Sequence, residues 1–132
     1  MGLLFLELEE VLEIHRDQIA LYGGSEGLRD LGLLQSAVAM PQAGFGDQYF
    51  HADLYEMAAA YLFHLASNHP FLDGNKRTAA MSAFTFLKMN GIILTASERA
   101  FETLVREVAE GKADKKAIAA FFRKNGRQSK VR

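Results

Sequence analysis

The chain has 132 residues, enough for one domain with a hydrophobic core, and 49% of them are apolar, as in ordinary globular proteins. Its formal net charge of −1 argues against direct binding to nucleic acid or to a membrane surface. The absence of cysteine excludes disulfides and zinc–thiolate sites. No apolar run is long enough to cross a membrane, and the N-terminal residues resemble no signal peptide, so we expect a cytoplasmic protein.

The first 67 residues predict three helices. Residues 3–6 fit a short strand, and residues 8–21 fit a helix with its apolar side chains on one face. Asp30 is a candidate cap for a short helix that runs through Met40. Residues 41–52 show no helical period and predict a loop or small hairpin, after which Asp53 caps a helix that runs to about Ser67.

The second half predicts three further helices. Residues 75–90 are apolar nearly all round, so we expect this helix to be central and buried. The stretch Thr95 to Glu98 has a capping-box pattern and precedes an amphipathic helix, and Asp114 starts a last helix. We therefore expect an all-α single domain over residues 1–125, with about six helices around a buried central helix and a small flap before residue 69. Residues 126–132 predict a basic, flexible tail.

The most informative segment runs from His69 to Arg77 and reads His-Pro-Phe-Leu-Asp-Gly-Asn-Lys-Arg. Pro70 cannot continue a helix, so the segment is expected to lie between two helices and to open the second. N–H groups in a first helical turn lack intrahelical partners, and Lys76 and Arg77 add positive charge, which together favour phosphate binding. Asp73 is poorly placed for an anion and suits Mg²⁺, while His69 is a candidate general base.

This segment resembles the core motif of the Fic/Doc family, which reads His-x-Phe-x-(Asp/Glu)-(Gly/Ala)-Asn-(Gly/Lys)-Arg. The chain matches it at seven positions, His69, Phe71, Asp73, Gly74, Asn75, Lys76 and Arg77. Further glycines and Asp30 after Tyr22 are similar to the death-on-curing (Doc) branch, and the resemblance extends over roughly residues 5–125.

The resemblance implies a role for each matched residue. His69 would deprotonate a hydroxyl of a target protein, Asp73 would hold Mg²⁺, and Arg77 would join them in catalysis. The phosphates of a nucleotide would be bound by four residues, Gly74, Asn75, Lys76 and Arg77. A flap, expected within residues 42–50, would position the target segment.

Two departures indicate which group is transferred. Family members that transfer AMP usually have glycine at the position of Lys76 and a second arginine at the position of Ala80. Both departures match the Doc branch. The resemblance to that branch implies transfer of the γ-phosphate of ATP to a Ser or Thr hydroxyl of a translation elongation factor, expected to be elongation factor Tu, with growth arrest. Arg106 breaks the pattern of self-inhibiting members, so we expect a separate antitoxin that acts in trans.

Other interpretations stay open at this stage. The chain could instead transfer AMP, or bind an antitoxin or nucleotide without turnover. Within the motif, Asp73 could only form a turn and Asn75 could only cap the helix. Among the other histidines, we expect His64 to be packed and hydrogen-bonded, and His15 and His51 to have surface or capping roles.

Overall fold

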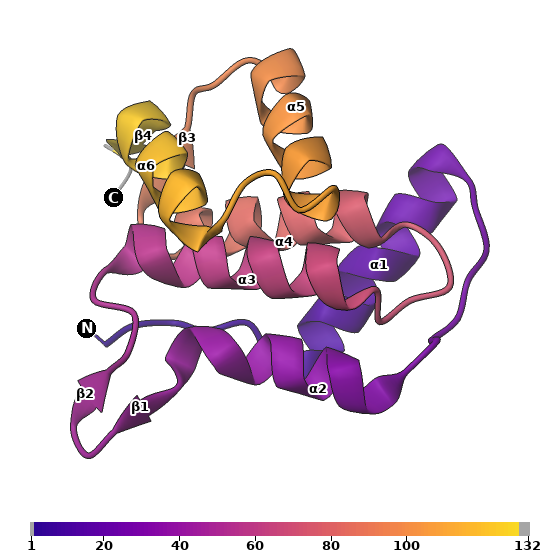
Figure 1. The fold of residues 1–132 in the computed structure, drawn as a ribbon, viewed down its shortest axis with the longest axis horizontal. Helices are drawn as coiled ribbons and strands as arrows, with labels where there is room; N and C mark the ends of the chain where they lie inside the picture. The colour runs from indigo at the N-terminus through magenta and orange to yellow at the C-terminus, as the bar shows by residue number, and fades with distance from the viewer. Residues whose placement is uncertain (1, 130–132) are drawn as a thin grey trace.

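The computed structural model describes residues 2–129, which form a bundle of six α-helices with two very small sheets (Figure 1). The elements in chain order are α1 Leu8–Tyr22, α2 Leu31–Ala39, a 3₁₀ turn Met40–Gln42, β1 Gly44–Phe45, β2 Gln48–Tyr49, α3 Leu54–Asn68, α4 Asn75–Met89, β3 Ile92–Leu94, α5 Glu98–Ala109, α6 Lys115–Asn125 and β4 Gly126–Gln128. This arrangement confirms the predicted all-α class. None of these helices is both long and apolar enough to span a membrane.

Local capping chemistry sets most helix starts. The carboxylates of Asp30, Asp53 and Asp114 each accept a hydrogen bond from a first-turn N–H of the helix that follows, as predicted. The predicted capping box at Thr95 is wrong, because α5 begins two residues later. Ser97 is its cap, and the Thr95 hydroxyl instead donates to the carbonyl of Asn125.

Helix α3 lies at the centre of the bundle and packs against α2, α4, α5 and α6. Of its fifteen residues, Ser67 alone is exposed. We expected the centre at residues 75–90, but α4 has solvent on one side, where Lys76, Arg77 and Met81 are exposed. The core therefore consists of α3 together with the inner face of α4, which leaves the start of α4 accessible.

Two predicted segments differ from expectation. Residues 3–6 form no strand, because the side chain of Asn90 bonds both the N–H and the C=O of Leu4, and the Tyr61 hydroxyl bonds those of Leu6. Residues 126–128, within the predicted tail, form β4, which pairs antiparallel with β3. Residues 130–132 of that tail lie outside the described part of the chain.

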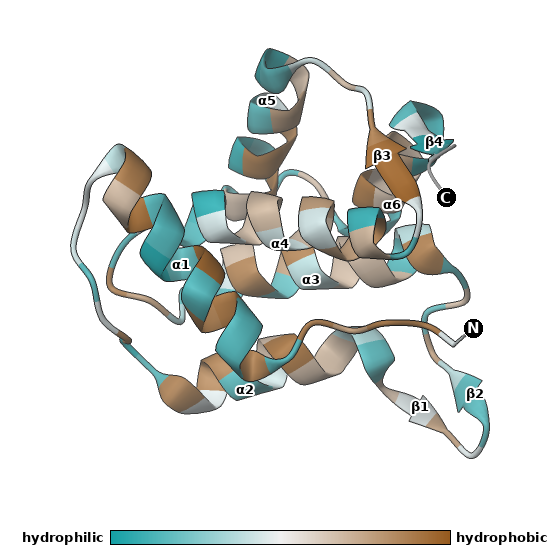
Figure 2. Cartoon of the chain, turned by 180° about the vertical axis from the view of Figure 1, so that it is seen from behind, coloured by the Kyte–Doolittle hydropathy of each residue, from teal (hydrophilic) through white to brown (hydrophobic). Residues whose placement is uncertain are grey.

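Residues 42–50 contain the predicted hairpin, formed by β1 and β2. It precedes α3, whereas His69 follows α3, and fifteen helical residues span about 22 Å. Figures 1 and 2 show the hairpin and the loop after α3 at opposite ends of the bundle. The hairpin therefore does not cover the segment from His69 to Arg77, and the α1–α2 loop (residues 23–30) lies against that segment instead.

Candidate functional site

The motif loop (residues 69–74) connects α3 to α4. It begins at His69, which ends α3 in the left-handed conformation with φ 50°, unlike every other non-glycine among residues 2–129. The imidazole of His69 is exposed and has no hydrogen-bond partner among the described residues. The candidate base, His69, is therefore held in a backbone conformation that only glycine adopts freely.

The α1–α2 loop holds the motif loop through its backbone. The N–H groups of Arg29 and Asp30 both donate to the carbonyl of Pro70, at 2.8 and 3.0 Å, and the N–H of Leu72 donates to the carbonyl of Gly27 at 3.1 Å. Leu28 and Phe71 form an isolated antiparallel bridge. These backbone bonds fix the motif loop without any bound ligand. A segment that carries catalytic side chains has to be held rigidly in this way.

His15 of α1 holds the middle of the motif loop. Its ring is 3% exposed and stacks on the Phe71 ring, with centroids 3.8 Å apart and an interplanar angle of 5°. Its Nε2 lies 2.8 Å from the carbonyl oxygen of Asp73. Because a carbonyl can only accept, Nε2 carries the proton. The expected surface or capping role of His15 is therefore wrong, and Phe71, itself buried, anchors the motif loop in the core.

The start of α4 is open to an anion. Gly74 is its N-cap, with φ 77°, and Asn75 lies in the first turn, where its side chain exchanges two 3.0 Å hydrogen bonds with the backbone of Phe71. The N–H groups of Asn75, Lys76 and Arg77 have no acceptor among residues 2–129. Asn75 is therefore a structural brace, and the three free N–H groups form the candidate phosphate cradle.

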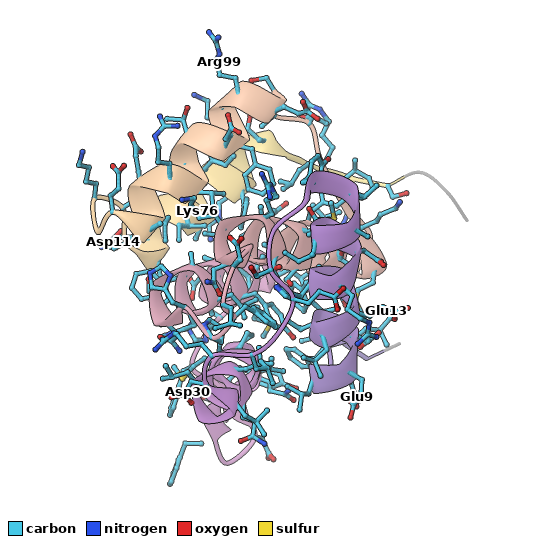
Figure 3. The ribbon with its side chains drawn as sticks, turned by 90° about the vertical axis from the view of Figure 1, so that its right-hand side faces the viewer. Glu9, Glu13, Asp30, Lys76, Arg99 and Asp114 are labelled. Carbon is cyan, nitrogen blue, oxygen red and sulfur yellow. The ribbon has the colours of Figure 1, made fainter. Side chains whose placement is uncertain are left out.

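Two exposed cations flank this cradle. Lys76 projects from the first turn of α4 (Figure 3) and makes no contact with another charged group among residues 2–129. The guanidinium of Arg77 lies over the Tyr22 ring, 5.0 Å from its centroid. Cations at a helix start oppose its dipole, so a bound anion would stabilise this arrangement.

Asp73 is exposed, and each carboxylate oxygen accepts one N–H: Oδ1 from Gly74 at 2.9 Å and Oδ2 from Ser25 at 3.2 Å. A carboxylate with two such bonds keeps further lone pairs for a cation. No group of three acidic, histidine or cysteine side chains among the described residues could form a metal cage. One carboxylate suits Mg²⁺ that takes its other ligands from water and substrate phosphates.

Other features lie away from the motif loop. Two surface hollows of about 620 and 460 Å³ are lined by residues 3–9 with α2, and by α3 with residues 108–117, so hollow size alone does not identify the candidate site.

A cluster of two histidines and a lysine also lies away from the motif loop. Lys115 Nζ lies 3.4 Å from Nε2 of His51 and 3.3 Å from Nε2 of His64. Burial, and then the Lys115 ammonium, lowers the pKa of His64 to about 4. The expected surface or capping role of His51 is therefore wrong, because its ring contacts Lys115 in this cluster.

Sequence reasoning gave no role at the site to three residues outside the motif: His15 and Arg29, which hold the motif loop, and Gly24, which makes room for it. A Cβ on Gly24 would lie 2.7 Å from Asp73 Oδ2, so this glycine lets the α1–α2 loop approach Asp73. Only His15 had a usable signal, because it lies four residues from Val11 and from Ile19 on the buried face of α1.

Comparison with known proteins identifies the family of this chain. A family model described as Fic/DOC family matches residues 5–87. The chain is 45% identical over 119 residues to "Toxin Doc" of Mycolicibacterium smegmatis, covering 88% of each protein. It is 39% identical over 84 residues to "Protein kinase doc" of Escherichia phage P1, covering 64% of this chain and 66% of that protein. The chain therefore belongs to the Fic/Doc family.

Proposed function

We propose that the chain is a Doc-type toxin that transfers the γ-phosphate of ATP to a Ser or Thr hydroxyl of a target protein. The observation that carries the proposal is the joint placement of an exposed, unpartnered His69 and an open cradle of N–H groups at the start of α4. One of its relatives is named a toxin and the other a protein kinase.

The chemistry assigned to the chain's residues is simple. His69 accepts the proton of the target hydroxyl as its oxygen bonds to the γ-phosphorus, and the bond between that phosphorus and the bridging oxygen breaks to release ADP. The cradle and the side chains of Lys76 and Arg77 hold the phosphates and offset their charge. When bound at Asp73, Mg²⁺ would neutralise charge on the phosphate oxygens.

The first turns of α4 favour phosphate over AMP as the transferred group. Lys76 fills space where AMP-transferring members usually have glycine. Ala80, three residues after Arg77 on the same side of the helix, offers no guanidinium to orient the outer phosphates. Transfer of AMP by the same fold remains the second candidate.

The proposal includes three expectations about the chain's surroundings. The target is a translation elongation factor, elongation factor Tu, and its modification arrests translation and growth in the cytoplasm. An antitoxin encoded alongside inhibits the chain in trans, because Arg106 stands where a self-inhibiting member has Ser or Thr. Neither nucleic acid nor membrane is a direct partner.

The test uses ATP labelled at either the γ- or the α-phosphate, incubated with the purified chain, Mg²⁺ and elongation factor Tu. We expect the target to become labelled with γ-labelled ATP and to stay unlabelled with α-labelled ATP. With the His69→Ala variant it should stay unlabelled in both cases. Label from α-labelled ATP would establish AMP transfer. No label from either, with ATP still bound, would mean that the chain acts on another target or binds without turnover.

A further inference from the structure

Arg29 makes the closest side-chain contacts with the end of α3. Its Nε donates to the carbonyl of His69 at 2.6 Å, and its Nη2 donates to the carbonyl of Asn68 at 2.8 Å. Arg29 precedes Asp30, the N-cap of α2 (Figure 3), so its backbone is fixed by the start of that helix. One planar guanidinium thus holds two successive carbonyls, one of which belongs to the candidate base.

The two hydrogen bonds of Arg29 stabilise the end of α3 and the backbone of His69. The last carbonyls of a helix have no intrahelical donors, and the carbonyls of Asn68 and His69 obtain theirs from Arg29. His69 also has φ 50°, which an ordinary L-residue adopts only when its surroundings enforce it. Because the peptide planes on either side of His69 determine where its Cβ points, fixing the carbonyls fixes the Cα–Cβ direction, and with it the region that the imidazole can reach.

We propose that Arg29 is a positioning residue that orients His69 for proton abstraction. This inference rests on the proposed function only in that it takes His69 as the base. The backbone N–H groups of Arg29 and Asp30 already attach the α1–α2 loop to Pro70. The loop therefore keeps its place without the Arg29 side chain, whose hydrogen bonds within residues 2–129 go to the carbonyls of Asn68 and His69.

This arrangement separates orientation from nucleotide binding. The candidate phosphate cradle consists of N–H groups and cations at the start of α4, and Arg29 contacts none of them among the described residues. Loss of the guanidinium therefore lowers the turnover number and leaves the apparent affinity for ATP unchanged. A lysine can replace only one of the two parallel hydrogen bonds, so it restores part of the turnover.

The experiment compares Arg29→Gln and Arg29→Lys with the matched control Arg99→Gln. Arg99 is the second residue of α5 and points away from the bundle (Figure 3), with no partner among residues 2–129. The first measurement is the NMR spectrum of the histidine rings in the free protein, which needs no substrate. In Arg29→Gln the His69 ring signals should move, while those of His51 and His64 stay in place, and Arg99→Gln should match the wild type.

The second measurement is steady-state phosphate transfer. We expect Arg29→Gln to lower kcat about tenfold to a hundredfold, with KM for ATP within about twofold of the wild type, and Arg29→Lys to lie between them. Unmoved His69 signals would overturn the proposal, as would a raised KM for ATP with unchanged kcat. If the wild type transfers no phosphate to elongation factor Tu, the proposed function fails for that target, and the NMR comparison still decides the role of Arg29.

Discussion

The stacked pair of His15 and Phe71 allows a quantitative test of how the motif loop is held. His15→Phe keeps an aromatic ring against Phe71 and removes the N–H that reaches the Asp73 carbonyl at 2.8 Å. A partly buried acceptor without a partner costs about 1–3 kcal/mol, and some water can reach Asp73, so we expect a loss of about 1–2 kcal/mol. His15→Ala also removes the stacking and leaves a cavity beneath Phe71, for a total loss of about 3–4 kcal/mol.

The assay is urea unfolding near neutral pH, followed by far-UV circular dichroism, with Glu13→Gln as the control. Glu13 lies on the exposed side of the same helix (Figure 3), so this change should stay within about 0.5 kcal/mol of the wild type. The reasoning is refuted if His15→Phe is as stable as the wild type, because the bond to Asp73 would then contribute nothing. It is also refuted if His15→Phe loses as much as His15→Ala.

Three further variants test other parts of the structure. Gly24→Ala places a Cβ 2.7 Å from Asp73 Oδ2 at φ 117°; it should cost about 1–3 kcal/mol in unfolding experiments and weaken Mg²⁺-dependent ATP binding measured by calorimetry. Asn75→Ala leaves the N–H and C=O of Phe71 without partners and should cost about 2 kcal/mol by the same unfolding assay, whereas an unchanged stability would remove its role as a brace. His64→Asn tests the acid response. The pKa of His64 is lowered from 6.5 to about 4, so the unfolded chain binds the proton more readily. Stability is then complete above pH 6.5 and falls as the pH drops towards 4, by about 1 kcal/mol once solvent screening is allowed for, and this fall should shrink in the variant.

Local signals predicted the helices well. Asp30, Asp53 and Asp114 cap helices where the sequence indicated, because a cap depends only on residues within one turn. The capping pattern at Thr95 misled, since a serine two residues later competes for the same role and the Thr95 hydroxyl is taken up by Asn125. A helix start capped by Thr95 and one capped by Ser97 differ by about one hydrogen bond, so tertiary contacts decide between them.

Long-range placement could not be predicted in the same way. The contacts of His15 with Asp73 and of Arg29 with His69 join residues 58 and 40 positions apart, and neither side chain lies in a recognisable motif. The distance between the hairpin and the motif loop follows from the length of α3, which the sequence did indicate. The direction in which the hairpin points depends on how the helices pack, which the sequence did not indicate. The seven motif positions could be recognised because they lie within nine consecutive residues of the sequence.

The most direct test of the account is the intact mass of elongation factor Tu after incubation with the purified chain, Mg²⁺ and ATP. The account predicts a gain of one phosphate group that requires His69 and is lost with His69→Ala. A gain of one AMP, or a gain of phosphate that persists with His69→Ala, would contradict it.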